Sequence, residues 1–525
     1  MQNHDAKFRS VLLAIAFVAV VIALVMASSG QWASIANTIA LGLAVNMIAI
    51  PLGICLARVC SNRGRVSFLV RGICLAFLFV PLFVYVSAWE SAVGKLGWLT
   101  NSTWSVNSIP LGNWMLAIWI HGIAAVPLVT VVLWFGLNGS IRIHEEQARL
   151  DASAGSVFWH ITLPRLMPLI GVLAVWIFVT CAREITVTDI YRIGTLAEQI
   201  YLGYSLGGLE NVAGPSFAMT AIGLIAMLIL LAIVPYFNEN LTSEEQSLNL
   251  SPANDNRWFH NFAAVVLVLL IAIIPLINLA TRASRYVENI DGNPIARYSI
   301  SNLIDVVKQV PVLYADEFQW STIIAFVSTC VIFLVAMLLI WLALESKTWR
   351  WLMLVLFVLS CSLPGPVIGS GLLWVRSVVD TDTTTFLFDR TIFAPVISNL
   401  VFCFPIGLVL MWFVLRNTAR DVLEHAKLEG AGRWNRLLQI GVGGNYIALL
   451  GVFVILFATC FGELSASQLA VPPGIDTIPR RMLGLLHSGV NDRTAGLTIV
   501  SVMFFVSLVT IGYALVYWNV RKSKQ

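Results

Sequence analysis

Twelve long apolar stretches constrain the fold of this chain more than any other feature of its sequence. A helix that crosses a lipid bilayer needs about 20 predominantly apolar residues. Of the 525 residues, 58% are hydrophobic and 11% are charged, and the mean hydropathy is +0.84, which excludes an ordinary soluble domain. We therefore predict an all-α polytopic membrane protein with about twelve transmembrane helices. The stretches cover approximately residues 10–28, 35–58, 67–88, 113–137, 165–183, 214–236, 259–280, 319–344, 350–374, 392–415, 445–463 and 495–519.

Prolines interrupt two of these stretches. Pro81 lies inside the third stretch, and residues 363–366 of the ninth read LPGP. Proline removes a backbone donor and clashes with the preceding turn of a helix. Membrane proteins tolerate such breaks where the broken helix lines a cavity or packs on its neighbours. We expect both spans to be kinked or broken.

Basic residues near the ends of the stretches predict the orientation of the chain. With twelve spans they fall on one side, and Lys and Arg favour the cytoplasmic side. Both termini are therefore expected to be cytoplasmic. The first stretch lacks a convincing small-residue cleavage site, so we interpret it as a retained anchor rather than a signal sequence. The basic residues are Lys7, Arg9, Arg58, Arg63, Arg65, Arg142, Arg149, Arg165, Lys347, Arg350, Arg416, Arg420, Lys427, Arg433, Arg436, Arg521, Lys522 and Lys524.

Two polar loops on the predicted cytoplasmic side have related sequences. The first, residues 145–164, reads EEQARLDASAGSVFWHITLP, and the second, residues 424–443, reads EHAKLEGAGRWNRLLQIGVG. Glu424 lies 278 residues after Glu146. Other features recur at a similar offset, as in the pairs Pro127 and Pro405, Pro81 and Pro364, and Glu184 and Glu463. This pattern predicts two tandem six-helix halves, residues 1–237 and 259–525, joined by a polar cytoplasmic linker at 238–258, with the translocation path between them.

The two loops resemble the EAA loop of permease subunits from binding-protein-dependent ABC importers. That pattern is Glu-Ala-Ala, three residues, Gly-Ala, and an apolar stretch ending Ile-x-Leu-Pro. Ala152 and Ser153 replace Gly-Ala in the first loop, and Val442 and Gly443 replace Leu-Pro in the second. The matching residues are Glu146, Ala148, Phe158, Ile161, Leu163 and Pro164 in the first loop and Glu424, Ala426, Gly430, Ala431, Trp434 and Ile440 in the second.

The resemblance implies that each loop docks on a separate ABC ATPase subunit and that an extracytoplasmic protein delivers the substrate. It also implies a bacterial inner membrane. A glycine is expected to turn the chain between two short helices, and because Ala152 lacks that freedom, Gly155 is the nearby residue able to take over. Glu146 and Glu424 suit a helix start, or pair with Arg149 and Lys427. The expected ATPase-docking residues are Glu146, Ala148, Asp151, Ala152, Glu424, Ala426, Gly430 and Ala431.

The chain is not expected to be an enzyme. It has no G-x-x-x-x-G-K-[ST] motif, so ATP and magnesium are expected on the partner ATPase and no cofactor on this chain. The eight cysteines show no spacing typical of zinc and are interpreted as small buried hydrophobic residues. No basic run suggests a nucleic-acid partner, and membrane lipid is the remaining expected contact.

A second pair of matched segments is predicted to line the translocation path. Residues 181–190 read CAREITVTDI and residues 461–470 read FGELSASQLA, each at the far end of the helix that leaves a docking loop. An acidic residue there is costly unless it faces water, a partner or the path. Two alternatives remain: Glu184 pairs with Arg183, or both glutamates cap local backbone. The predicted path residues are Glu184, Thr186, Thr188, Asp189, Glu463, Ser465 and Ser467.

The substrate is the least constrained prediction. The fused arrangement and the run EITVTDIYRIGTLAEQIY resemble iron(III) permeases, and ferric ion prefers carboxylate and phenolate oxygens. Glu184 and Glu463 would then contact the metal transiently. The rival substrate is thiamine, a cation that Tyr191, Tyr201 and Tyr204 would suit. The rival class is an ion-gradient-driven secondary transporter with Glu184 and Glu463 as proton sites.

Overall fold

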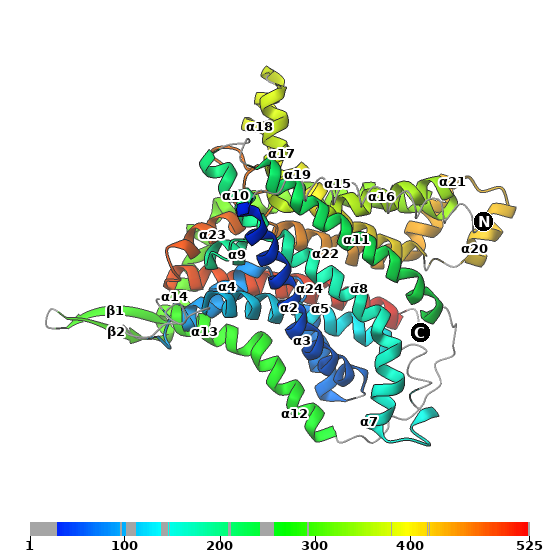
Figure 1. The fold of residues 1–525 in the computed structure, drawn as a ribbon, viewed down its shortest axis with the longest axis horizontal. Helices are drawn as coiled ribbons and strands as arrows, with labels where there is room; N and C mark the ends of the chain where they lie inside the picture. Colours follow the sequence, from blue (N-terminus) through cyan, green and yellow to red (C-terminus); the bar gives the residue numbers. More distant parts are fainter. Residues whose placement is uncertain are drawn as a thin grey trace. The chain divides into compact units, whose positions relative to one another are not determined.

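The structure is a computed structural model, almost entirely helical in the part that it describes (Figure 1). It describes residues 29–62, 64–94, 97–100, 112–137, 145, 147–207, 212–241, 257–290, 293–379, 381–416, 418 and 420–522. Its helices up to residue 283 are α2 (Ser29–Ser61), α3 (Arg65–Phe77), α4 (Leu82–Val93), α5 (Gly112–Leu137), α7 (Ala154–Val157), the π-helix η2 (Phe158–Thr162), α8 (Leu163–Arg183), α9 (Thr186–Tyr191), α10 (Leu196–Gly207), α11 (Ala213–Leu241), α12 (Arg257–Val268), the π-helix η4 (Leu269–Ile273) and α13 (Ile274–Ala283).

A β-hairpin follows, and helices fill the rest of the described chain. The remaining elements are β1 (Arg285–Ile290), β2 (Asn293–Tyr298), α14 (Ile300–Leu313), α15 (Ala315–Glu345), α16 (Lys347–Ser362), α17 (Gly365–Val378), α18 (Asp382–Arg390), α19 (Phe393–Arg416), α20 (Arg420–Leu428), α21 (Arg433–Arg436), the π-helix η5 (Leu437–Val442), the 3-10 turn η6 (Gly443–Asn445), α22 (Tyr446–Phe461), α23 (Ile478–His487) and α24 (Asp492–Lys522).

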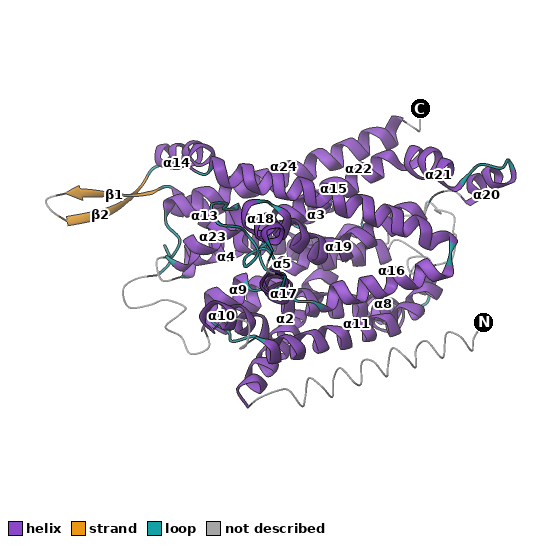
Figure 2. Ribbon diagram, turned by 90° about the horizontal axis from the view of Figure 1, so that it is seen from above, coloured by secondary structure: helices purple, strands orange, loops and turns teal. Residues whose placement is uncertain are grey.

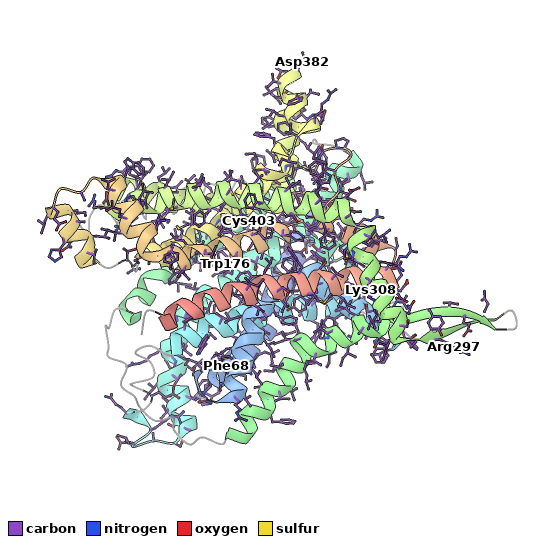
Figure 3. The ribbon with its side chains drawn as sticks, turned by 180° about the vertical axis from the view of Figure 1, so that it is seen from behind. Phe68, Trp176, Arg297, Lys308, Asp382 and Cys403 are labelled. Carbon is purple, nitrogen blue, oxygen red and sulfur yellow. The ribbon has the colours of Figure 1, made fainter. Side chains whose placement is uncertain are left out.

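The described residues contain nine helices that are long and apolar enough to cross a membrane, and two bent helix pairs that meet the same test as pairs. Counting each pair as one span gives up to eleven, and each corresponds to one of the predicted stretches. The stretch 10–28 lies outside the described residues. Apolar side chains on these helices are widely exposed, for example Met47 at 79% and Phe68 at 62%. Figure 3 labels Phe68 among the side chains drawn as sticks. Such faces suit lipid, so the chain has the character of a multi-pass membrane protein.

The two bent pairs confirm the prediction drawn from the prolines. Helices α3 and α4 meet at 105°, and helices α16 and α17 meet at 98°. Pro81 and Pro364 each precede the second helix of their pair, with φ of −66° and −70° and extended ψ. Proline cannot donate to the preceding turn, so the first helix ends before it, and its fixed φ suits the start of the next.

Contacts divide the chain into two compact units, residues 1–310 with 485–501, and residues 311–484 with 502–525. In the first unit, α2 packs against α5 and α8, and α8 also packs against α11. Glycines allow the close crossings. A Cβ on Gly42 would lie 2.5 Å from the Phe178 ring, and one on Gly53 would lie 2.3 Å from Val129. Small residues at such crossings let helix backbones approach in a membrane.

The second unit repeats this packing order. Helix α15 packs against α19 and α22, and α16 packs on α15 and α19. Gly407 on α19 meets Ile332 on α15, where an added Cβ would lie 2.7 Å from the isoleucine side chain. Each unit therefore contains a long helix, a bent pair and two further spans in the same chain order, as the internal offset predicts. The two predicted sequence halves remain a prediction, since α12–α14 pack within the first unit although they follow the linker.

The segment 281–318, which connects two of the predicted spans, contains an antiparallel hairpin and a helix. Strands β1 and β2 lie side by side and antiparallel (Figure 2). Arg285 lies opposite Tyr298, and Glu288 lies opposite Ile295. Arg297 and Glu288 form an ion pair of 2.9 Å. Asn302 at the start of α14 donates to the carbonyls of Ala283 and Arg285, which fixes the base of the hairpin.

Candidate functional site: two polar loops and the matched segments beyond them

The first polar loop is built from a short turn, the helix α7 and the π-helix η2. Arg149 N–H donates to the Glu145 carbonyl and Ala152 N–H to the Ala148 carbonyl, closing the turn. Ser153 then caps α7 by accepting from Ser156 N–H. Glu146 lies outside the described residues. Of the other predicted docking residues, Ala148 is half-buried, and Asp151 and Ala152 are exposed.

The second loop contains the glycine turn that the sequence predicts. Gly430 has φ +82°, and the bonds from Gly430 N–H to the Lys427 carbonyl and from Ala431 N–H to the Ala426 carbonyl close the end of α20. This pair of bonds is a Schellman motif with glycine in its left-handed position. Glu424 is exposed, and Ala426 and Ala431 are half-buried.

The first loop turns without a glycine. Gly155 does not have a positive φ and lies inside α7, so the expectation that it takes over the turn was wrong. The chain instead turns through residues 149–152 with backbone bonds that any residue can make. The two loops therefore make their turns through different local chemistry.

Both loops present an exposed leucine at the same place. Leu150 and Leu428 lie 278 residues apart in the aligned ARLD and AKLE runs, and each side chain is 85% exposed. Each loop then enters its span through a π-helix, η2 in the first and η5 in the second. π-helical turns are rare in proteins overall, and those that occur often lie at functional sites. A π-helix after both loops therefore indicates that the two loops share one structural design.

Ion pairs tie each loop to the long helix of its own unit. In the first unit, Glu145 contacts Arg58 at the end of α2 at 3.1 Å and Arg149 at 2.8 Å. In the second unit, Glu345 at the end of α15 contacts Arg433 at 2.6 Å and Arg436 at 2.9 Å. The signs are reversed between the two units. The ion pairs that reach the long helices join residues 87 or more positions apart, so the spacing of charges along the sequence does not indicate them.

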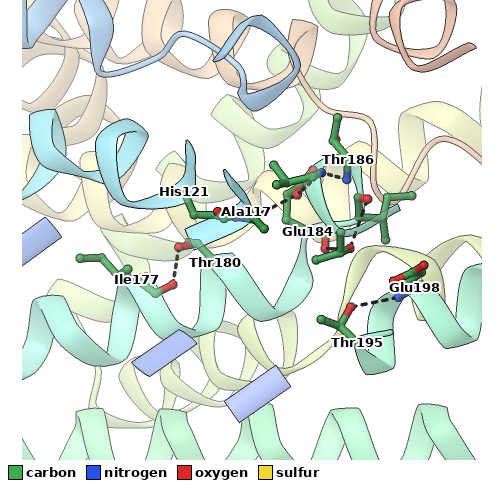
Figure 4. Close-up of polar contacts among 11 residues, drawn as sticks. Ala117, His121, Ile177, Thr180, Glu184, Thr186, Thr195 and Glu198 are labelled. Carbon is green, nitrogen blue, oxygen red and sulfur yellow. Dashed lines mark hydrogen bonds and ion pairs between the residues drawn. The ribbon is translucent and has the colours of Figure 1, made fainter. Parts of the chain in front are cut away.

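Glu184, the first predicted path glutamate, caps the short helix α9 (Figure 4). Its carboxylate accepts from Thr186 N–H at 2.5 Å and Val187 N–H at 3.1 Å. The buried His121 of α5 places Nε2 3.5 Å from the same carboxylate, and His121 Nδ1 lies 2.9 Å from the Ala117 carbonyl. Because a carbonyl only accepts, Nδ1 carries a proton and Nε2 is the nitrogen that faces Glu184.

Glu463 also caps the turn that follows it in the second unit, with its bonds shifted by one residue. Its carboxylate accepts from Ala466 N–H at 2.5 Å and from Ser467 N–H at 3.1 Å. The hydroxyls of Thr188 and Ser467 each donate back to the carbonyl of the glutamate four residues before, both at 3.4 Å. Of the alternatives left open by the sequence, local capping is therefore what the structure shows for both glutamates, and their path role remains a prediction.

The other predicted path residues are buried around these caps. Thr186, Thr188, Ser465 and Ser467 are each no more than 6% exposed, and Asp189 is 7% exposed. Asp189 lies 3.2 Å from His487 within the first unit. None of these side chains lies on an open surface.

Two further buried groups follow α9. Burial raises the pKa of Glu198, and the Gly194 N–H that it accepts at 2.7 Å opposes that rise. Burial also raises the pKa of Tyr191 well above its usual value, and the neighbouring Glu90 adds to the effect. Between them Arg192 has φ +50°, an uncommon conformation for a residue with a side chain. Buried polar contacts therefore hold the connection between α9 and α10 in place.

The described residues hold no group of three or more His, Cys, Asp or Glu side chains placed to bind a metal ion. Six of the eight cysteines are buried, in line with their interpretation as small hydrophobic residues, whereas Cys55 is exposed and Cys330 is half-buried. In the second unit Arg480 pairs with Asp476 at 3.9 Å and Arg481 with Glu317 at 3.7 Å. These carboxylates offset the positive charge of the two arginines.

Replacing the cap at Glu184 tests its structural role. Glu184→Ala should lower the free energy of unfolding by about 1–2 kcal/mol, because the N–H groups of Thr186 and Val187 lose their acceptor. Thermal unfolding of the purified protein in detergent measures this loss. Asp151→Ala removes an exposed acid and is the matched control, expected to change the midpoint little. Equal midpoints for the two variants would show that the cap contributes nothing.

The two loops and the segments beyond them share several local features. Two loops of related sequence each expose a leucine and lead into a π-helix, and a glutamate beyond each loop caps the local backbone. No protein-family model and no curated protein matches the chain, so these residues and their contacts are what a functional proposal must rest on.

Proposed function

We propose that the chain is the membrane-embedded permease subunit of an ABC importer, with its two polar loops docked on separate ATPase subunits. The observation that carries the proposal is the pair of leucines, Leu150 and Leu428, which occupy equivalent places in the two loops and are each 85% exposed. A strongly exposed apolar side chain within a polar loop suits a protein partner, where a few buried anchors supply most of the binding energy.

The loops are also connected so that a partner could move the spans. Arg58 joins the first loop to α2 through Glu145 and stacks 4.5 Å from the ring of Phe158 in η2. Glu345 joins the second loop to α15 through Arg433 and Arg436. A displacement of either loop is thereby passed to the long helix at the centre of its unit. ATP hydrolysis belongs to the partner in this proposal, because this chain has no phosphate-binding motif.

For the substrate we propose iron(III), with thiamine as the alternative, delivered by an extracytoplasmic binding protein. The proposal rests on the run 184–201, with its carboxylates and tyrosines. Glu184 and Glu463 already accept backbone N–H groups, so any contact with a passing cation is brief. The bacterial inner membrane and cytoplasmic termini belong to the same proposal.

Substitution of the paired leucines tests the docking. The double variant Leu150→Asp with Leu428→Asp should lose co-purification of the ATPase, because each aspartate places a charge in an apolar contact. Affinity should fall by about tenfold or more for each anchor removed. Leu206→Asp is the matched control, since Leu206 is 86% exposed on α10 and lies outside both loops. Wild-type ATPase recovery with the double variant would count against docking, and transport driven by a proton gradient without any ATPase would favour a secondary transporter.

A further inference from the structure

A small cavity lies beside Glu463 in the second unit. It offers about 10 Å³, room for roughly one water-sized body. Helices α15, α19 and α22 and the segment after α22 all contribute to its wall. Its polar lining residues are Ser321, Asn399, Glu463, Ser467 and Thr477, together with Cys460.

The side chain of Asn399 has a buried oxygen that lacks a hydrogen-bond partner among the described residues. Asn399 is 2% exposed, and its amide nitrogen donates to Ser328 Oγ and to the Cys460 carbonyl, both at 3.4 Å. Its Oδ1 is fully buried and has no hydrogen-bond partner in the described part of the chain. A buried acceptor left without a donor is costly, so a bound group is expected to contact it.

Several neighbouring groups also offer oxygen lone pairs to the cavity. The hydroxyl of Ser467 donates to the carbonyls of Glu463 and Leu464. The Ser321 Oγ accepts from Ile478 N–H. Glu463 contributes a carboxylate. A water molecule would need donors as well as acceptors around it, which the Ser321 and Thr477 hydroxyl groups are able to supply, so water is the alternative occupant. A cation accepts lone pairs only, which matches a wall of oxygen atoms.

The first unit shows how the same place is filled by a side chain. His121 lies 278 residues before Asn399, and Glu184 lies 279 residues before Glu463. There the imidazole Nε2 faces the carboxylate at 3.5 Å. In the second unit Asn399 stands at the corresponding position of the chain, and its Oδ1 has no hydrogen-bond partner among the described residues. The last turn of α22, which ends at Phe461, adds the negative end of a helix dipole to this side of the cavity.

We propose that this cavity binds one small monovalent cation of about the size of sodium, held by Asn399 Oδ1, the Glu463 carboxylate and neighbouring hydroxyl and carbonyl oxygens. The cation does in the second unit what the His121 side chain does in the first. It joins α19 to the turn that Glu463 caps, and it is a fixed part of the fold rather than the transported substrate. The proposal does not depend on the ATPase partner.

The test uses the full chain in lipid nanodiscs. Binding of radioactive sodium is measured together with thermal unfolding in sodium chloride and in N-methyl-D-glucamine chloride at equal ionic strength. We expect one saturable site per chain and a midpoint that rises with sodium concentration, because a ligand that binds only the folded state stabilises it. Lithium should substitute better than potassium, given the small volume. No saturable sodium binding, together with equal unfolding midpoints in the two salts, would show that the cavity holds only water and would overturn the proposal.

Three variants locate the site. Asn399→His supplies the imidazole of the first unit and should abolish sodium binding while retaining a folded protein. Asn399→Asp keeps an oxygen in place and should bind at least as tightly as wild type. Glu463→Gln should weaken binding by about tenfold or more. Glu424→Gln removes an exposed acid and is the control that should bind normally. Sodium binding that survives in both Asn399→His and Glu463→Gln would place the cation elsewhere and contradict the assignment.

Discussion

Gly430→Val is expected to reduce recovery of the ATPase partner by about tenfold or more while leaving the protein inserted and folded. Gly430 has φ +82°, and a β-branched residue is a strong outlier in that conformation. Forcing a side chain there costs about 1–2 kcal/mol or more, which corresponds to about a tenfold or greater loss of the docked geometry. The space around Gly430 is open, so the effect comes from the backbone and not from a clash. Co-purification of the ATPase and ATP-driven transport in liposomes measure it.

The second loop offers a matched control two residues further on. Gly432 also has open space around it, but its φ is −62°, which any residue adopts. Gly432→Val should therefore bind the ATPase and transport as wild type does. If Gly430→Val and Gly432→Val behaved alike, the left-handed turn would have no part in docking. A normal unfolding midpoint for Gly430→Val separates lost docking from lost folding.

The features that the sequence could predict are those set by local chemistry. Long apolar stretches predicted each of the spans, up to eleven, that the described residues contain, and Pro81 and Pro364 predicted the two broken ones. The turn at Gly430 followed from glycine alone. These features depend on chain length, on proline and on glycine, whose effects act within one or two turns.

The features that the sequence did not predict depend on packing between distant segments. Glu184 was identified, yet its partner His121 lies on another helix, and only the packing of α5 on α9 brings them together. The tether from Arg58 to Glu145 has the same origin. The hairpin β1–β2 was missed because its strands are short and polar, and the apolar period that guided the analysis carries no signal there. Gly155 was misjudged because a turn closed by ordinary backbone bonds needs no glycine.

Close approach of two segments also explains why α17 begins with glycines. Gly365 and Gly369 lie one turn apart on α17, in the run GPVIG. A Cβ on Gly365 would lie 2.5 Å from the carbonyl carbon of Ser465, and one on Gly369 would lie 2.8 Å from the Ala466 carbonyl oxygen. Small residues four apart give a helix a flat face on which another backbone can rest. The turn capped by Glu463 therefore packs directly against α17, the second helix of the broken span.

Gly365→Ala is accordingly expected to lower the free energy of unfolding by about 1–3 kcal/mol, the usual cost of overpacking. The atoms that meet the new methyl group belong largely to the Ser465 backbone, which cannot rotate away as a flexible side chain would. Gly371→Ala lies on the same helix with open space around it and should instead be neutral or stabilising, since alanine favours a helix over glycine by about 0.5–1 kcal/mol. Thermal unfolding of both variants in detergent makes the comparison. A loss confined to Gly365→Ala places the strain at the contact with Ser465, whereas equal midpoints would mean that α17 moves away from the capped turn at no cost.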